Sequence, residues 1–296
     1  MLSQIWRKNI MPIELVKEKY SGAINTVEIG KGDKAVRIGG ETTLPFLFEE
    51  GDMPHKPVVA LEVFDTEPFN ATAEFAPPLL YVRLQAIHPD YGNRSADEAI
   101  AMVKAAYQKT GVPLIIAGCG DAEKDNEVLP KVSQAFKGEN FLFGIATQSN
   151  YKTLAATALA DGHSIIAESP IDINIAKQLN ILISDMGFDP ARIVMHPTTT
   201  SLGYGMEYVY SIMERGRLAA FIGDKMLSMP FILFVGQEVW KTKEAKEFGE
   251  GQGINWELAT AISMLQAGAD ILVLRHPHTV TAVTKYIEMA MDRGKQ

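Results

Sequence analysis

Short runs of apolar residues, many of them β-branched, recur along the chain with room for a helix between most of them. Runs of this length bounded by glycine, proline or polar residues are typical of buried strands, and alternation with helices is typical of a parallel sheet. The pattern predicts eight strands: Val58–Phe64, Leu79–Leu84, Pro113–Ala117, Phe141–Ile145, Ser164–Ala167, Arg192–His196, Phe231–Val235 and Asp270–Leu274.

Helix boundary signals fall between these runs. Ser95 precedes two acidic residues in a capping pattern, and Asp121 and Asp172 stand at two other predicted helix starts. Glycines stand where three helices are expected to end: Gly111, Gly187 and Gly268. Eight strands with interleaved helices favour an α/β fold, a TIM-type (β/α)8 barrel, with a doubly wound open sheet as the alternative.

Two segments within the first 80 residues depart from the alternation of strands and helices. Residues 27–38 alternate on both sides of a Gly-Lys-Gly-Asp turn, which predicts an N-terminal β-hairpin that acts as a lid over one end of the domain. Between Phe64 and Leu79 lie 14 residues that include three prolines, so we expect a shortened first βα repeat without an ordinary crossover helix. We expect a single TIM-barrel domain over 1–296, with residues 1–55 as an N-terminal extension and 56–296 as the barrel.

Composition and charge exclude several classes of protein. The 296 residues are 47% hydrophobic, enough for one large core, and a net charge of −8 argues against a nucleic-acid partner. The one cysteine, Cys119, cannot by itself hold an iron–sulfur cluster or a Cys-rich zinc site. Apolar stretches are far shorter than the roughly 20 residues of a membrane span, so we expect a soluble cytoplasmic protein without a membrane partner. Neither a dinucleotide fingerprint nor a phosphate loop follows a predicted strand.

Barrels of this type carry their sites at the C-terminal ends of the strands. The residues predicted there are mostly neutral hydroxyls and amides, with few paired acids and bases. No predicted strand ends in lysine, and no nucleophile stands beside a base, so we expect a binding surface with no catalytic residue. Cys119 is interpreted as a small packed residue, and the spacing of the six histidines indicates no metal site.

The most specific local feature is the segment 198–205, Thr-Thr-Thr-Ser-Leu-Gly-Tyr-Gly. Its two glycines permit close backbone approach, and the helix start that follows offers free N–H groups to an acyl, amide or phosphate oxygen. A glycine-rich turn that merely starts a helix is the alternative. Its place at the end of a predicted strand favours binding.

Long stretches of the chain resemble the small subunit of the corrinoid iron–sulfur protein, the delta subunit of the acetyl-CoA decarbonylase/synthase complex. The resemblance runs from about residue 22 to 276. The stretches that carry it include Pro57–Asp65, His88–Ser95, Gly118–Leu129, Ser169–Asn174, Leu202–Tyr208, Gly223–Leu227 and Gln266–Leu272.

The resemblance implies an α/β barrel that pairs with a large subunit carrying a [4Fe–4S] cluster and the corrinoid. The corrinoid (a cobalamin) would lie between the two, facing the top of this barrel. Transient complexes with a methyltransferase and with acetyl-CoA synthase would pass a methyl group from methyl-tetrahydrofolate, or its methanopterin counterpart, along the Wood–Ljungdahl pathway. The expected corrinoid-binding residues are Asn150, Ser169, His196, Thr198, Thr199, Thr200, Leu202, Gly203, Tyr204, Gly205 and His276.

Two positions differ from the pattern that the resemblance implies. Segment 66–78 is short where the family carries a helix, and His196-Pro197 stands where the family reads Asp-Pro. We therefore expect His196→Asp to bind corrinoid at least as well as the parent. The alternative functions are a barrel that binds a pterin and transfers methyl itself, and an unrelated barrel lyase.

Overall fold

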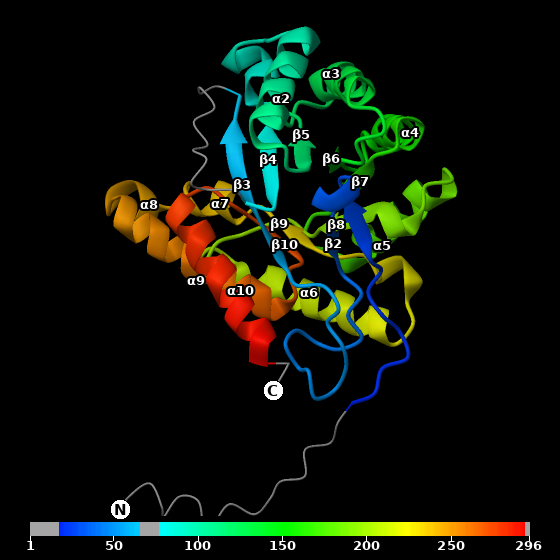
Figure 1. Cartoon of the computed structure of the whole chain (residues 1–296), viewed down its shortest axis with the longest axis vertical. Helices are drawn as coiled ribbons and strands as arrows, with labels where there is room; N and C mark the ends of the chain where they lie inside the picture. The colour runs from blue at the N-terminus through cyan, green and yellow to red at the C-terminus, as the bar shows by residue number, and fades with distance from the viewer. Residues whose placement is uncertain (1–17, 66–76, 294–296) are drawn as a thin grey trace, which may run out of the picture.

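The core of the molecule is an eight-stranded parallel sheet that curls into a barrel (Figure 1). The computed structural model describes residues 18–65 and 77–293. Each predicted strand is present within two residues of its expected bounds: β3 (Val58–Phe64), β4 (Leu79–Arg83), β5 (Leu114–Ala117), β6 (Leu142–Ala146), β7 (Ser164–Glu168), β8 (Ile193–His196), β9 (Ile232–Leu233) and β10 (Ile271–Leu274).

The strands follow the order β8-β7-β6-β5-β4-β3-β10-β9. A single bridge between Met195 and Phe231 joins the two outer strands, β8 and β9, and this contact nearly closes the ring. The barrel prediction is therefore confirmed, and the open sheet is wrong. Segment 66–76 lies outside the described residues, so the shortened first repeat stays a prediction.

Helices surround the barrel, and their capping residues are those that the sequence predicts. Ser95 forms a capping box with Glu98, and Asp121 and Asp172 accept hydrogen bonds from the first-turn N–H groups of their helices. Gly111 and Gly268 end two helices in the left-handed conformation. The helices are α2 (Ala96–Thr110), α3 (Ala122–Ala135), α4 (Tyr151–Asp161), α5 (Ile173–Asp185), α6 (Met206–Phe221), α7 (Val235–Val239), α8 (Lys243–Glu247), α9 (Glu250–Ala267) and α10 (Pro277–Arg293).

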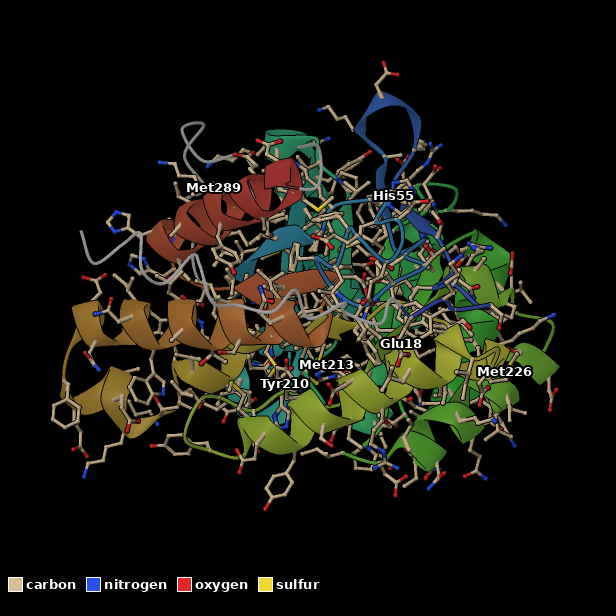
Figure 2. All side chains as sticks on the ribbon, turned by 90° about the horizontal axis from the view of Figure 1, so that it is seen from below. Glu18, His55, Tyr210, Met213, Met226 and Met289 are labelled. Atoms are coloured by element: carbon tan, nitrogen blue, oxygen red, sulfur yellow. The ribbon has the colours of Figure 1, made fainter. Side chains whose placement is uncertain are left out.

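Alternation along each strand divides the core into two layers. On β3, Val58 and Ala60 point into the barrel, whereas Val59 and Leu61 pack outward among the helices. The interior is filled by side chains, as is usual for eight strands. Figure 2 shows the molecule from below, with Tyr210 and Met213 of the outer layer on α6, which runs beside α9.

The predicted hairpin is β1 (Val27–Ile29) paired antiparallel with β2 (Val36–Ile38). Its apolar side chains join the cluster inside the barrel, so the hairpin closes the N-terminal end of the strands. Gly30 N–H donates to the carbonyl of Asn140, just before β6, at 2.6 Å. The prediction of a lid over one end is confirmed, and that end is opposite to the predicted site.

A buried ion cluster fixes the rest of the N-terminal segment to the barrel. Arg217 of α6 lies 2.8 Å from Asp270, just before β10, and 3.5 Å from Glu41. All three side chains are at most 2% exposed. Because a buried charge without its partner costs about 3–5 kcal/mol, removing any one of them would loosen this segment.

The barrel is regular from β4 to β7 and irregular after β8. Each of β4 to β7 is followed by one long helix, whereas β9 is two residues long and is followed by the three helices α7, α8 and α9. The predicted strand Phe231–Val235 extends too far, because Val235 already begins α7. In the described residues, no helix is both long and apolar enough to cross a bilayer.

Candidate functional site

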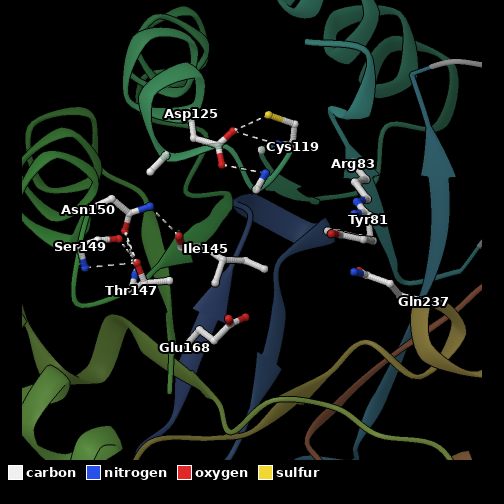
Figure 3. A pocket seen from close by; sticks show the side chains of 13 residues that line it. Tyr81, Arg83, Cys119, Asp125, Ile145, Thr147, Ser149, Asn150, Glu168 and Gln237 are labelled. Atoms are coloured by element: carbon white, nitrogen blue, oxygen red, sulfur yellow. Dashed lines mark hydrogen bonds between the residues drawn. The ribbon is translucent and has the colours of Figure 1, made fainter. Parts of the chain in front are cut away.

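A cavity of about 320 Å³ opens at the C-terminal ends of β4 to β7 (Figure 3). Cavities of this size are the usual place for small ligands. It lies at the end of the barrel where the sequence predicted binding. Its lining residues are Tyr81, Arg83, Gly118, Cys119, Gly120, Ala122, Asp125, Ile145, Thr147, Ser149, Asn150, Glu168 and Gln237.

Tyr81 and Arg83 reach the cavity from β4. They are two residues apart and therefore share the inward face of the strand. Tyr81 is 1% exposed, and burial, helped by the charge of Glu62, raises the pKa of its hydroxyl, which stays protonated. Arg83 lies at the end of the predicted strand Leu79–Leu84, whereas sequence reasoning missed Tyr81. Alternation backwards from Arg83 is the signal that would have found it.

The loop after β5 is organised by Asp125. Its carboxylate accepts hydrogen bonds from the N–H groups of Cys119 (2.8 Å) and Gly120 (3.0 Å), and from the Cys119 thiol (3.3 Å). Gly118 leaves room for this carboxylate, since a Cβ there would overlap it. Burial, together with the nearby Asp125, raises the pKa of the thiol to about 11. Cys119 is therefore a protonated donor, in agreement with its interpretation as a packed residue.

Asn150 is the one predicted corrinoid-binding residue that lines this cavity. Its amide oxygen accepts from Thr147 N–H at 2.7 Å, and its amide nitrogen donates to the Ile145 carbonyl at 3.2 Å. Thr147 also shares a hydrogen bond with Ser149. The side chain of Asn150 therefore holds the β6–α4 loop in place.

Glu168 and His196 form an acid–base pair between the cavity and the barrel wall. His196 Nδ1 lies 2.8 Å from Glu168 Oε2, and Nε2 lies 3.0 Å from the Thr199 hydroxyl. Because the carboxylate only accepts, Nδ1 carries the proton. The Thr199 oxygen also accepts from Phe234 N–H at 2.9 Å, which joins the end of β8 to the end of β9.

Two such pairs correct the prediction that the rim is mostly neutral. Besides Glu168 and His196, Arg275 Nε lies 2.9 Å from the buried Glu62. The partners are 28 and 213 positions apart, so local sequence gave no sign of either pair.

The loop 198–205 leaves β8 and reaches α6, as predicted. Gly203 and Gly205 have positive φ angles, and Gly205 caps α6 without a side-chain hydrogen bond. Thr198 also has a positive φ of 69°, unusual for a β-branched residue, and its hydroxyl donates to the Ser169 carbonyl at 2.8 Å. The loop thus has a specific backbone conformation.

The remaining predicted residues contact the irregular half of the barrel. Trp256 of α9 donates to the Leu202 carbonyl, and the half-exposed Tyr204 donates to Glu244 of α8. His276 stacks on Trp240 and lies 3.1 Å from Glu250. The hydroxyls of Ser169, Thr200 and Ser201 are buried without a hydrogen-bond partner in the described residues.

The predicted residues therefore share one end of the barrel but do not form a single pocket. Asn150 lies on the cavity, and the others lie along β7, β8 and the loops that contact α8, α9 and α10. Within residues 18–65 and 77–293, no three histidine, cysteine or acidic side chains come together as metal ligands would.

Solved structures support the barrel. A dihydropteroate synthase from Yersinia pestis, with a pterine–sulfa conjugate, matches with a TM-score of 0.58 over 80% of this chain and 94% of its own, at 12% identity. The enzyme from Thermus thermophilus, in complex with 4-aminobenzoate, matches with a TM-score of 0.53 over 83% and 98%, at 12% identity. At such identities the likeness shows the fold alone.

Sequence comparisons give the family. A family model described as CO dehydrogenase/acetyl-CoA synthase delta subunit matches residues 26–289. The delta subunit of the acetyl-CoA decarbonylase/synthase complex from Archaeoglobus fulgidus is 30% identical, covering 92% of this chain and 71% of its own. The delta subunit from Methanothermobacter thermautotrophicus is 32% identical, covering 88% and 74%. The chain therefore belongs to the delta-subunit family of CO dehydrogenase/acetyl-CoA synthase.

Proposed function

We propose that this chain is a non-redox subunit that caps a corrinoid and positions it for methyl transfer. The observation that carries the proposal is a polar cavity at the barrel mouth of a delta-subunit chain, with no activated nucleophile among the described residues that line it. Its only thiol is protonated, and the carboxylate beside it is held by two backbone N–H groups. A cavity of this kind can hold and orient a cofactor, while the partner protein supplies the reacting groups.

The corrinoid would be shared with a larger cytoplasmic subunit that carries the [4Fe–4S] cluster, since one cysteine cannot ligate a cluster. A methyltransferase and acetyl-CoA synthase would contact the assembly in turn. On this chain the cap would consist of the cavity and of the loop 198–205, with Ser169, His196 and His276 behind it. Tyr204 is the aromatic residue of that loop, and its half-exposed ring is accessible to a flat macrocycle.

The first test is the absorption spectrum of the purified chain. We expect no iron–sulfur or corrinoid band from the chain alone, and corrinoid retention when it is purified with a cysteine-rich corrinoid subunit. A chain that never co-purifies with such a subunit would contradict the proposal.

A second test uses Tyr204→Glu in the complex. A charge on the loop should reduce corrinoid retention about tenfold, while the unfolding midpoint stays close to that of the parent. Met289→Glu, at an exposed position on α10, is the control and should leave retention unchanged. Equal loss of folding and binding in Tyr204→Glu would give the loop a structural role instead.

The second candidate is a barrel that binds a pterin and transfers methyl itself. The observation that favours it is the likeness to dihydropteroate synthases, one of them solved with a pterine conjugate. Titration of the isolated chain with methyl-tetrahydrofolate separates the two candidates, because the capping function requires no pterin affinity.

A further inference from the structure

Three polar side chains face the barrel-mouth cavity without a hydrogen bond or ion pair to any described residue. They are Tyr81, Arg83 and Gln237. Tyr81 is 99% removed from solvent, yet its hydroxyl lines the cavity. The hydroxyl keeps its remaining exposure at the cavity, so it is free to donate a hydrogen bond to a group bound there.

The other polar groups of the cavity are already occupied. Asp125 accepts from the Cys119–Gly120 loop, Asn150 holds the β6–α4 loop, and Thr147 and Ser149 bond to each other. Glu168 differs because His196 engages only its Oε2 atom. Its Oε1 atom makes no hydrogen bond to the described part of the chain and is the one free carboxylate oxygen of the lining.

These free groups lie on opposite sides. Figure 3 shows the Tyr81 hydroxyl and the Gln237 amide directed toward the side from which Glu168 projects. The donors, Tyr81 and Arg83, come from β4, and the acceptor, Glu168, comes from β7. A ligand between them would accept hydrogen bonds at one edge and donate at the other.

The charge of the cavity selects among such ligands. The carboxylate of Asp125 is engaged by two backbone N–H groups, so the charged groups left free in the lining are one guanidinium, Arg83, and one carboxylate, Glu168. An anionic ligand would meet Glu168 and a cationic ligand would meet Arg83, each at the cost of a desolvated like-charge contact. A neutral planar group with a carbonyl and an N–H₂ satisfies both edges, and a primary carboxamide is the simplest.

We propose that the cavity binds a primary carboxamide arm of the corrinoid, with the carbonyl on Arg83 and Tyr81 and the NH₂ on Glu168. This inference rests on the proposed function, because it takes the ligand from the periphery of a corrin ring. Gln237, which both donates and accepts, completes the contact. His196 acts as a positioning residue that fixes the carboxylate of Glu168.

The test is an NMR titration of the full chain, labelled with ¹⁵N. The probes are dicyanocobinamide, whose arms end in amides, and dicyanocobyrinic acid, whose arms end in carboxylates. We expect cobinamide to shift the Arg83 Nε–H and Gln237 side-chain signals, with Arg192 as the unshifted reference, and to bind about tenfold more tightly than the acid.

Substitutions in the cavity should change the affinities for the two probes in predictable directions. Arg83→Met and Gln237→Leu should each weaken cobinamide binding severalfold, whereas Glu168→Gln should raise affinity for the acid relative to the amide. Lys104→Met, an exposed cation on α2, is the control. Unmoved Arg83 and Gln237 signals at millimolar cobinamide, or equal affinity for both probes, would overturn the inference. Co-purification with the corrinoid subunit tests the proposed function separately, so either can fail while the other stands.

Discussion

The two halves of the barrel mouth use their polar residues in opposite ways. From β4 to β7, loop residues such as Asp125 and Asn150 bond to their own loops, so that Tyr81 and Arg83 remain free over the cavity. Between β8 and β9, where backbone pairing is reduced to one bridge, the Thr199 hydroxyl connects the two strands. Polar residues of similar type therefore leave free groups over a cavity in one half and close the barrel in the other.

The closure between β8 and β9 explains the difference. Pro230 has no N–H, and the strands share only the Met195–Phe231 bridge. Just after β9, the N–H of Phe234 donates to the Thr199 side chain rather than to a strand carbonyl. His196 completes the contact at the edge of the Phe234 ring. Two residues that sequence reasoning assigned to the corrinoid thus have partners within the chain.

Removing the Thr199 hydroxyl should destabilise the barrel closure strongly. Thr199→Val leaves the buried Phe234 N–H and His196 Nε2 without their common partner, so we expect a loss of about 3 kcal/mol. Urea unfolding measures it. Thr281→Val, on α10, is the matched control and should stay within about 0.5 kcal/mol of the parent. Equal stabilities for the two variants would mean that this contact does not hold the barrel closed.

The thiol on the cavity side should be unreactive. With a pKa of about 11, Cys119 is far less ionised at pH 8 than a free cysteine, whose pKa is about 8.5. We expect its reaction with a disulfide reagent to be about two orders of magnitude slower than in the urea-unfolded chain. Asp125→Asn should speed the reaction by removing the neighbouring charge. A native rate as fast as the unfolded rate would contradict the protonated state.

The structure changes the result that we expect for the His196→Asp variant. Sequence reasoning expected an acid at this position to preserve binding, but the side chain faces the carboxylate of Glu168. Two facing carboxylates repel, so we expect a loss of about 1–2 kcal/mol at pH 7 that diminishes as the pH falls and one carboxyl group takes up a proton. His278→Asp, at an exposed position, is the control. A stability independent of pH would exclude this repulsion.

His163, which lies away from both halves of the barrel mouth, should have a smaller effect on stability that depends on pH. It is fully buried, accepts from Phe141 N–H and lies 3.1 Å from the Ser133 carbonyl, and burial lowers its pKa. Because the unfolded state then binds the extra proton, stability should be full above about pH 6.5 and fall below it, by at most about 1.4 kcal/mol per pH unit. His163→Phe should remove this part of the slope, which unfolding at pH 7.5 and 5.5 measures.

The fold was predictable because its signals are local. Apolar runs, caps such as Ser95 and stop glycines such as Gly268 each act within a few residues. For the candidate site, the sequence predicted the end of the barrel on which it lies but not the side chains that form it. Tyr81 could have been found from alternation with Arg83, whereas the pairing of Glu168 with His196 depends on the register between β7 and β8. Nor does composition show that Thr199 joins two strands, since that contact spans 35 positions.

The hairpin under the barrel has a consequence for the order in which the chain folds. Its segment is held by late partners: Asn25 N–H donates to Ser228, Gly22 N–H to Phe221, and Glu41 meets an arginine that is itself held by Asp270. During synthesis these residues emerge before the barrel strands, yet their binding surface exists only after β10 has been made. The β1–β2 hairpin is therefore expected to dock last, and a ribosome-bound chain that lacks β10 should leave it exposed to proteases.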